Sequence, residues 1–417
     1  MRSFAARVLL LASLVGSRAV AQSLVNATFS SGLTGWSYQE PIALWTSQDA
    51  NGSPVSGSVL VTNTNTATSE VTLRQCVTLS GGRTYDFGAK AKVASGQAAT
   101  GGARTRVLPY PTENCSGPYL FYKTSSSVAG GGEWSSVVGS VDVPADAKSL
   151  SFLLVLLKNG STGQFQASFD DAWLVPAAPT TLTVPSSASI HGNGSSFFHS
   201  DLWVMNHSPS HGQTITARYR CFTGQACPPE AKTFLLAPRQ SMLYADVVGP
   251  GLFAAPETAG AIELTYDRSL GQVSAASRVY TPSLPAPTNG TAVPALESAE
   301  ARTRTLFVGL GSTGGSTASG FRSNAGAYNP GDSSVSVTFT LYNGPTGTVL
   351  GRPFTRTWAP HEAYQINNVF AVLEAASAVT TNAYLVVTAS APVFPFVTVI
   401  DNQSGDSVWV RGVADAP

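Results

Sequence analysis

Histidines offer the first opportunity for metal chemistry in this sequence. Four of the five histidines lie within a span of 21 residues, with one aspartate among them: His191, His199, Asp201, His207 and His211. On a β-strand the side chains of His199 and Asp201 would share one face, so a zinc site with imidazole and carboxylate ligands could form there. An internal repeat argues against this site, because Arg322 and Asn324 occupy the matching positions of the second copy. We therefore interpret the cluster as polar residues at strand ends and in a turn.

Motifs typical of enzymes are otherwise absent from the sequence. There is no Gly-x-Ser-x-Gly elbow, no His-Glu-x-x-His and no pattern of a cysteine or histidine nucleophile. Gly309–Gly314 has the letters of a dinucleotide-binding loop, but no helix is predicted after it, and phosphate binding depends on a helix N-terminus. The carboxylates of a glycoside hydrolase are defined by their distance in space, so a hydrolase stays open as a third alternative. Because no catalytic motif is recognisable and only 12% of the residues are charged, we predict that the chain is not an enzyme.

The N-terminus has the pattern of a secretory signal peptide. Basic Arg2 and Arg7 precede the apolar run Val8–Val15, and Ala19-Val20-Ala21 matches the Ala-x-Ala cleavage pattern. We predict a signal peptide over residues 1–21 and a mature product that is secreted or periplasmic. No later stretch approaches the roughly 18 apolar residues of a membrane span, and no cysteine follows the signal to carry a lipid, so we expect no membrane insertion.

The four cysteines are predicted to form disulfides, which is the ordinary state of cysteine pairs in exported proteins. They fall as two pairs along the chain, Cys76 with Cys115 and Cys221 with Cys227. Four cysteines allow three sets of pairings. Bonds between domains would require the domains to pack intimately, so we favour the bonds within each domain, where the second would staple a hairpin tip.

The composition excludes one class of partner and favours one class of fold. The formal net charge is zero, so no basic surface is available to neutralise the phosphates of a nucleic acid. Glycine, serine, threonine, alanine and valine dominate, and β-branched residues alternate with small polar ones. This pattern predicts an all-β protein. No pattern requires a cofactor.

The C-terminal two-thirds of the chain consists of two copies of one segment. Phe198–Asn206 aligns with Phe321–Asn329 at an offset of 123 residues. At an offset of 122 the alignment continues through three further pairs: Leu236–Gln240 with Trp358–Glu362, Ala245–Val248 with Asn367–Phe370, and Ala261–Leu264 with Ala383–Val386. Known solenoid repeats are about 20–50 residues long, so this longer period indicates tandem domains.

Proline-rich connectors at Val175–Thr180 and Tyr280–Gly290 divide the mature chain into three domains. We predict these domains over residues 22–178, 179–284 and 302–417, with a linker at 285–301. Alternating runs such as Ser334–Tyr342 predict about seven strands in each copy, as in an immunoglobulin-like β-sandwich. The pair resembles tandem β-sandwich repeats of exported proteins from environmental Gram-negative bacteria. These repeats are uncharacterised, so the resemblance implies no activity.

The N-terminal domain carries the most informative pattern. Turn residues and large aromatic residues recur in five segments: Asn26–Phe29, Gly32–Trp36, Leu73–Tyr85, Trp134–Pro144 and Phe169–Leu174. We expect Trp36, Tyr85 and Trp134 to anchor the core of a jelly roll of two sheets. In order and spacing, these segments resemble the carbohydrate-binding modules with a galactose-binding-like jelly-roll fold that are attached to bacterial cellulases and xylanases. Most of the matching residues build the core, so the resemblance speaks for the fold more than for sugar binding.

The resemblance implies a sugar site lined by aromatic faces and planar polar side chains. Aromatic rings suit sugars because the C–H face of a pyranose packs on a ring, while its hydroxyl groups need hydrogen bonds. By residue type and position, the candidates for contacting sugar are Trp45, Tyr110, Tyr119 and Tyr122. The alternative is that each is an ordinary aromatic residue of a strand or loop.

The same family often holds a structural calcium ion near an acidic pair at the end of the domain, and Asp170 or Asp171 matches that position. Calcium takes six or more oxygen ligands. Neighbouring residues of a regular strand point to opposite faces, so only one of the two carboxylates is expected to bind through its side chain. Calcium is therefore a candidate structural ion.

These observations favour an exported, non-catalytic protein that binds a polysaccharide or glycoconjugate through its N-terminal jelly roll, with the repeats as spacer domains. The alternative is a structural or adhesion protein of the cell envelope that binds a cell-surface protein and no sugar. An aromatic groove lined with hydrogen-bonding groups on the first domain would favour the first function. A broad apolar patch on the repeats would favour the second.

Overall fold

The computed structural model describes residues 24–39, 42–160, 163–192, 196–282, 288–314 and 319–414. The predicted signal peptide, residues 1–21, lies outside this range. The described residues form four antiparallel sheets, as the all-β prediction requires. The chain divides into two compact units, residues 1–177 and 178–417. Within the described ranges, no helix is both long and apolar enough to cross a membrane.

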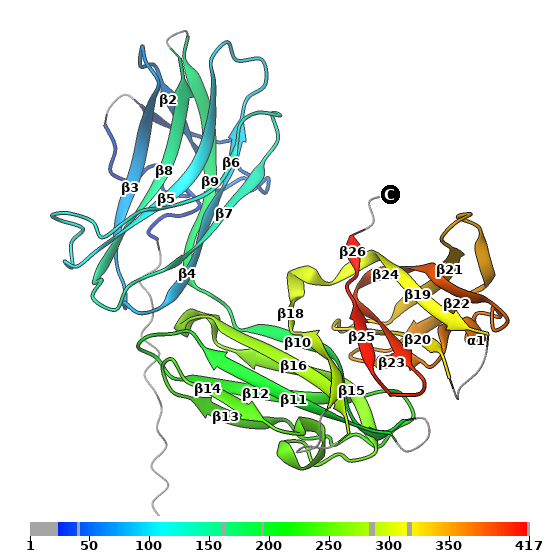
Figure 1. Cartoon of the computed structure of the whole chain (residues 1–417). Coiled ribbons are helices and arrows are strands. Elements are labelled where there is room, and N and C mark those ends of the chain that lie inside the picture. The colour runs from blue at the N-terminus through cyan, green and yellow to red at the C-terminus, as the bar shows by residue number, and fades with distance from the viewer. Residues whose placement is uncertain are drawn as a thin grey trace, which may run out of the picture. The chain divides into compact units, whose positions relative to one another are not determined.

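The first unit is built from two sheets (Figure 1). One sheet has, in spatial order, β1 (Ala43–Thr46), β2 (Ser58–Asn63), β9 (Phe165–Pro176), β4 (Thr84–Val93) and β7 (Ser135–Asp142). The other has β3 (Ser69–Thr78), β8 (Ser149–Asn159), β5 (Thr100–Tyr110) and β6 (Lys123–Val128).

Alternating apolar side chains of both sheets meet in one core. Two of the three expected anchors, Trp36 and Tyr85, are buried in it, and the ring of Trp36 stacks on Phe29 at 5.4 Å. Trp134 is only half-buried and lies outside this core, because it precedes the strand β7 instead of lying within it.

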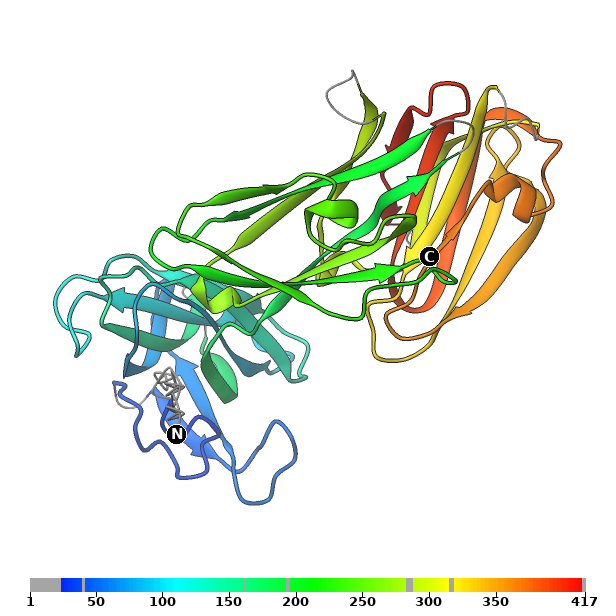
Figure 2. The ribbon, with the colours of Figure 1, turned by 90° about the horizontal axis from the view of Figure 1, so that it is seen from below.

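The second unit contains two β-sandwiches that lie side by side (Figure 2). The first sandwich has one layer of β13 (Lys232–Leu236), β12 (Gln213–Cys221), β15 (Thr258–Tyr266), β10 (Thr180–His191) and β18 (Leu296–Glu297). Its other layer has β14 (Ser241–Tyr244), β11 (Phe197–Asn206), β16 (Val273–Thr281) and β17 (Asn289–Pro294). Its helical turns are Val247–Gly251, Arg268–Leu270 and Ser298–Glu300.

The second sandwich repeats this strand order. One layer has β22 (Val349–Trp358), β21 (Val335–Asn343), β24 (Val379–Asp401), β19 (Arg302–Thr313) and β26 (Val413–Ala414). The other has β23 (Ala363–Ile366), β20 (Phe321–Tyr328), the end of β24 and β25 (Ser407–Val410), and the short helix α1 (Val369–Val372) follows β23. The long strand β24 thus serves both layers.

Aligned polar residues of the two copies make the same hydrogen bonds. The side-chain oxygen of Asp201 accepts from the backbone N–H of Asp246 at 2.9 Å, and Asn324 accepts from that of Asn368 at 3.0 Å. Both Asp246 and Asn368 have a left-handed backbone and cap the following helical turn. The polar residues at these positions therefore build the scaffold of each copy.

The stretch predicted as a linker contains ordered elements. Residues 289–294 form β17, which pairs with β16, and 296–297 form β18, which pairs with β10. Residues 283–287 lie outside the described ranges. The described part of this stretch therefore adds strands to the first sandwich.

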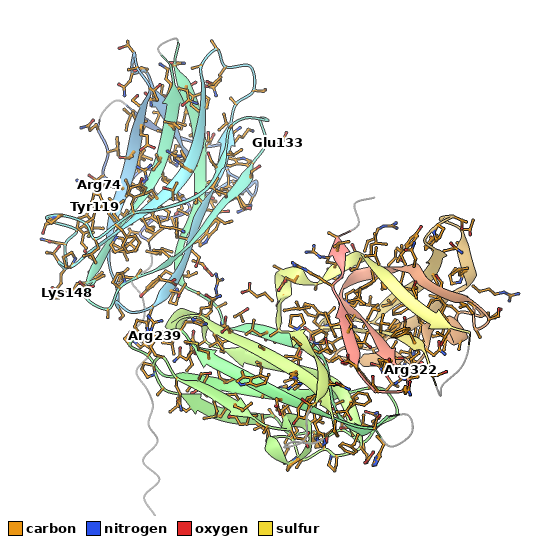
Figure 3. All side chains as sticks on the ribbon, viewed as in Figure 1. Arg74, Tyr119, Glu133, Lys148, Arg239 and Arg322 are labelled. Carbon is orange, nitrogen blue, oxygen red and sulfur yellow. A yellow bond between two sulfur atoms is a disulfide. The ribbon has the colours of Figure 1, made fainter. Side chains whose placement is uncertain are left out.

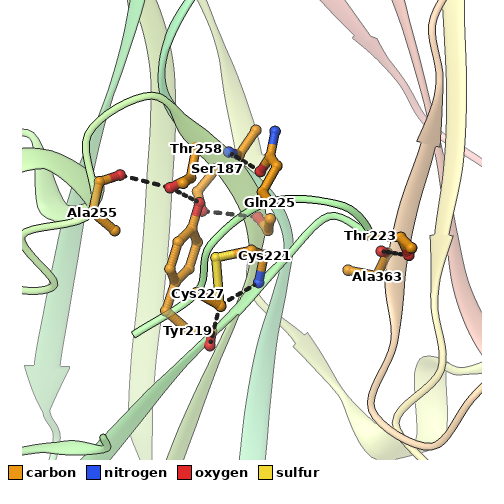
Figure 4. The surroundings of a disulfide bond; sticks show 11 residues. Ser187, Tyr219, Cys221, Thr223, Gln225, Cys227, Ala255, Thr258 and Ala363 are labelled. Carbon is orange, nitrogen blue, oxygen red and sulfur yellow. Dashed lines mark hydrogen bonds between the residues drawn. A yellow bond between two sulfur atoms is a disulfide. The ribbon is translucent and has the colours of Figure 1, made fainter. Parts of the chain in front are cut away.

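Both predicted disulfides are present, Cys76–Cys115 and Cys221–Cys227. The loop closed by the second one joins the two sandwiches of the second unit (Figure 4). Thr223 in this loop donates its backbone N–H to the carbonyl of Ala363 at 3.0 Å. The ring of Phe222 stacks on Phe396 of the second sandwich at 6.0 Å. The predicted hairpin tip is therefore part of a packed contact between the sandwiches.

Candidate functional site

The outer face of the β3–β8–β5–β6 sheet carries a group of charged and aromatic side chains. On β3, Leu73 and Val77 point into the core, so the alternating residues Glu70 and Arg74 lie on the outer face. On β5 the core residues Ala103 and Val107 place Arg104 and Arg106 on the same outer face. We call this surface the tyrosine face, and we include in it Tyr110 at the end of β5 and two tyrosines of the connection between β5 and β6. Its residues are Glu70, Arg74, Arg104, Arg106, Tyr110, Tyr119 and Tyr122.

An ion-pair network crosses the centre of the tyrosine face. The two carboxylate oxygens of Glu70 accept from the two terminal nitrogens of Arg106 at 2.7 and 2.8 Å, and Arg104 also donates to Glu70. The strands that carry these residues are separated by β8, on which Val155 is fully buried although it lies outside the core. The network therefore crosses β8 and holds planar polar groups in fixed positions.

The two arginines keep Glu70 ionised. Burial alone would raise the pKa of the Glu70 carboxyl, but the hydrogen bonds and charges of Arg106 and Arg104 outweigh it and hold the pKa below its ordinary value. At neutral pH the face therefore presents a carboxylate beside two guanidinium groups.

Tyrosine rings lie next to these charges. The guanidinium of Arg106 lies 5.1 Å from the centre of the Tyr122 ring, within the range of a cation–π contact. Tyr110 and Tyr119 meet edge to face at 6.3 Å. Tyr122 and Tyr119 are 58% and 49% exposed, so their rings are available to a ligand, whereas Tyr110 is buried and supports Tyr119.

The Cys76–Cys115 disulfide positions the connection that carries Tyr119 and Tyr122. Cys76 lies on β3, and Cys115 lies between β5 and β6. The backbone N–H of Cys115 also donates to Ser149 at 3.0 Å. Figure 3 labels Arg74 on β3 and Tyr119 in this connection. The covalent bond thus ties the tyrosine connection to the strand that carries Glu70 and Arg74.

Trp45, the fourth candidate for sugar contact, lies elsewhere. It is on β1, in the other sheet of the unit, and its indole N–H donates to the carbonyl of Phe29 at 2.7 Å. The structure therefore brings together the three candidate tyrosines and separates Trp45 from them.

The acidic pair Asp170 and Asp171 lies at a bulge in β9. The pairing with β4 shifts between Gly88 and Lys90, and Asp171 has a left-handed backbone. As a result, both carboxylates bind the loop after β1: Asp170 accepts from the backbone of Ala50 at 2.8 Å and Asp171 from the side chain of Asn51 at 2.5 Å. The expectation that the pair points to opposite faces is therefore wrong, because the bulge interrupts the alternation.

The fit of a calcium ion can be judged from the donors around this pair. Asp170 is fully buried, and its second oxygen accepts from the backbone N–H of Asp171 at 2.7 Å. Lys90 places its ammonium 3.9 Å from Asp171. Burial raises the pKa of Asp170 to about 6. Both oxygens of Asp170 and one oxygen of Asp171 already interact with N–H groups or the ammonium. In the described ranges no group of three or more His, Cys, Asp or Glu side chains could hold a metal ion, so this pair alone does not make a calcium site. Calcium stays a prediction for direct titration.

The histidine cluster is dispersed over separate polar contacts. His199 Nδ1 lies 3.0 Å from Asp246, and His191 Nδ1 lies 2.7 Å from Glu257. Across the described ranges of the chain, no group of three or more His, Cys, Asp or Glu side chains could hold a metal ion. These two histidines thus interact with carboxylates that are far from them along the chain.

Comparison with known proteins relates the N-terminal region to a protein family. The model of a family described as carbohydrate binding domain matches residues 21–159. The N-terminal region is therefore similar to a carbohydrate-binding domain. The match includes every residue of the tyrosine face. No curated protein matches the chain.

Three solved structures are similar to this chain or to a part of it. The first contains modules of the Clostridium thermocellum endo-1,4-β-D-xylanase 10B with xylohexaose; it is 17% identical, with 37% of this chain and 29% of that chain covered and a TM-score of 0.28. The second is TmCBM61 with β-1,4-galactotriose, at 15% identity, 38% and 100% coverage and a TM-score of 0.27. The third is the N-terminal tandem CBM22 domain of Paenibacillus barcinonensis Xyn10C, at 11% identity, 95% and 98% coverage and a TM-score of 0.29. At these scores, the matches do not identify a ligand for this chain.

The sequence analysis named the tyrosines of this face as candidates but did not name Glu70, Arg104 or Arg106. A usable signal was present, because Arg104 and Arg106 are two residues apart and would share a face on any strand. Their partner Glu70 is 34 and 36 residues away, and only the strand order places it opposite them.

Proposed function

We propose that this protein is an exported, non-catalytic glycan-binding protein, secreted or periplasmic. Its N-terminal jelly roll binds a polysaccharide or glycoconjugate on the tyrosine face, and its two immunoglobulin-like repeats act as spacer domains. The observation that carries the proposal is the gathering of exposed Tyr119 and Tyr122 beside the Glu70–Arg106 ion pair, inside the matched carbohydrate-binding region.

The chemistry of the tyrosine face suits a sugar. An exposed tyrosine ring can pack against the C–H face of a pyranose. Beside it, the Arg106 guanidinium donates in a plane and the Glu70 carboxylate accepts, so neighbouring hydroxyl groups of one sugar can be bound as acceptor and donor. The network is formed before the ligand arrives, which limits the entropy lost on binding.

Binding of the purified, oxidised full-length chain to a panel of soluble and insoluble polysaccharides tests the proposal. We expect saturable binding to at least one neutral glycan, weakened about fivefold by Tyr122→Ala, because one stacked ring is worth on the order of 1 kcal/mol. Tyr384→Ala is a matched control, since Tyr384 stacks on Tyr342 in the second unit, far along the chain from the tyrosine face. Absence of binding across the panel would contradict the proposal.

The alternative function is a structural or adhesion protein of the cell envelope that binds a cell-surface protein. One observation favours it: Trp203 on β11 and Leu243 on β14 are cross-strand neighbours, and they are 37% and 50% exposed. If a partner protein binds through this pair, Trp203→Ser should abolish its binding and leave glycan binding unchanged.

A further inference from the structure

A cavity lies between the two sandwiches of the second unit. Its volume is about 490 Å³, within the range of roughly 300–1,000 Å³ that is usual for small-molecule sites. The walls come from both sandwiches, with Phe198 and Gln225 from the first and Arg322 and Asn324 from the second. Figure 3 labels Arg322 on this unit. The cavity is separate in the chain from the carbohydrate-binding region that ends at residue 159.

The charge on the walls of this cavity has one sign. Its lining residues include the cations or potential cations Arg322 and His191, and they include no aspartate or glutamate. The imidazole of His191 already has a carboxylate partner, because its Nδ1 lies 2.7 Å from Glu257. Arg322 has no carboxylate within ion-pair distance in the described part of the chain, and its guanidinium donates to the amide oxygen of Asn402. The arginine is half-buried, so its charge is partly removed from water without a counter-charge.

The internal repeat shows how this imbalance arises. His199 is the counterpart of Arg322 in the first copy, and it pairs with the carboxylate of Asp246 at 3.0 Å. The counterpart of Asp246 in the second copy is Asn368, which lines the cavity. The same scaffold therefore places a carboxylate beside the imidazole in the first copy and leaves the guanidinium of the second copy without one.

Amide groups add uncommitted donors to the same walls. The side-chain oxygen of Gln225 accepts from the backbone of Ala259 at 2.8 Å, and that of Asn324 accepts from the backbone of Asn368 at 3.0 Å. Neither NH₂ group has a hydrogen-bond partner within the described ranges. A ligand rich in acceptors would satisfy both of them.

An apolar surface completes the site. Phe198 and Phe222 both line the cavity, and Phe222 is held in place by its stacking on Phe396. Aromatic rings beside amide donors and a guanidinium suit a ligand that combines C–H faces, hydroxyl groups and a negative charge.

We propose that this cavity binds a mono- or disaccharide that carries a carboxylate, a uronic acid. Arg322 pairs with the carboxylate, Gln225 and Asn324 donate to ring or hydroxyl oxygens, and the ring of Phe198 packs on a sugar face. The site is distinct from the tyrosine face, and it does not depend on glycan binding there.

Isothermal titration calorimetry of the full-length chain with digalacturonate and with neutral galactobiose tests the proposal. We expect digalacturonate to bind at least about tenfold more tightly than galactobiose, because a charge-assisted hydrogen bond is the main difference between the complexes. Asn368→Asp supplies the carboxylate that the first copy already has, so it should balance Arg322 internally and weaken digalacturonate binding about tenfold or more. Aspartate occupies the equivalent left-handed position at Asp246, so this variant is expected to fold.

Arg322→Gln should weaken digalacturonate binding to a similar degree. The matched control is Arg352→Gln, since Arg352 is exposed and already paired with Glu374. Equal affinity for galactobiose and digalacturonate, or affinity unchanged in Asn368→Asp and Arg322→Gln, would overturn the proposal. Tighter binding of N-acetylphenylalanine than of digalacturonate would assign the cavity to a peptide carboxylate and also overturn it. If Tyr122→Ala abolished digalacturonate binding and the cavity variants did not, the binding site would be the tyrosine face, and the proposal would be overturned.

Discussion

Removal of the Cys76–Cys115 disulfide should affect both the stability of the first unit and its glycan binding. The cysteines are 39 residues apart, and closing a loop of that length stabilises the folded state by about 4 kcal/mol in the chain-entropy model. The Cys221–Cys227 bond closes a loop of only 6 residues, for which the same model gives about 2 kcal/mol. The two bonds thus differ in how much they are expected to stabilise the folded state. Only the first one holds the connection that carries Tyr119 and Tyr122.

The assay compares the double variants Cys76→Ser/Cys115→Ser and Cys221→Ser/Cys227→Ser in urea. With a urea dependence of about 2 kcal/mol/M, the first variant should lower the unfolding midpoint of the first unit by roughly 2 M. In conditions where that unit is still folded, glycan affinity should also fall, because Tyr119 and Tyr122 lose their covalent attachment to β3. The second variant should bind glycan as the native chain does.

Two results would refute this reasoning. An unchanged urea midpoint for Cys76→Ser/Cys115→Ser would mean that the disulfide does not restrict the unfolded first unit. Unchanged glycan affinity in the same variant would mean that the connection between β5 and β6 keeps its conformation through noncovalent contacts alone, or that it does not form the sugar site.

Three further predictions concern single residues. Glu70→Gln leaves two guanidinium groups without their carboxylate, so it should lower the free energy of unfolding by about 1 kcal/mol and weaken glycan binding several-fold, as urea titration and binding isotherms would show. Burial raises the pKa of Asp170 from 3.8 to about 6. Between these two pH values the folded chain keeps a proton on Asp170 that the unfolded chain releases. The stability that this proton contributes is therefore complete below about pH 4 and is lost as the pH rises through 6. Asp170→Asn should flatten that decline in calcium-free urea titrations between pH 4 and 7, and an unchanged slope would contradict the assignment. Phe222→Ala should destabilise the second unit by about 3 kcal/mol because its buried ring packs between the two sandwiches, with glycan binding as the control that stays constant.

The sequence was informative where local patterns decide the outcome. Strand alternation and composition predicted an all-β chain, and cysteine spacing predicted both disulfides. Residue type and position also selected Tyr110, Tyr119 and Tyr122, which do meet on one face. These features depend on neighbours in the chain or on side-chain period, both of which can be seen in the sequence.

The sequence does not reveal features that depend on the arrangement of distant strands. Trp45 has the same chemical character as the three tyrosines, but β1 belongs to the other sheet of the unit. Asp170 and Asp171 were expected to diverge, but a bulge paired against β4 turns both toward one loop. A bulge depends on the register of two strands, so it cannot be predicted from the alternation of residues within one strand.

The sequence by itself determined the fold class, the cysteine pairs, the internal repeat and the aromatic candidates, because these follow from composition, spacing and alternation. Only the tertiary structure decided that Glu70 meets Arg104 and Arg106 across β8, and that Arg322 lines a cavity without a carboxylate beside it. The physical reason is that a charge acts through space over a few ångströms, and the order and register of strands set which charges come that close.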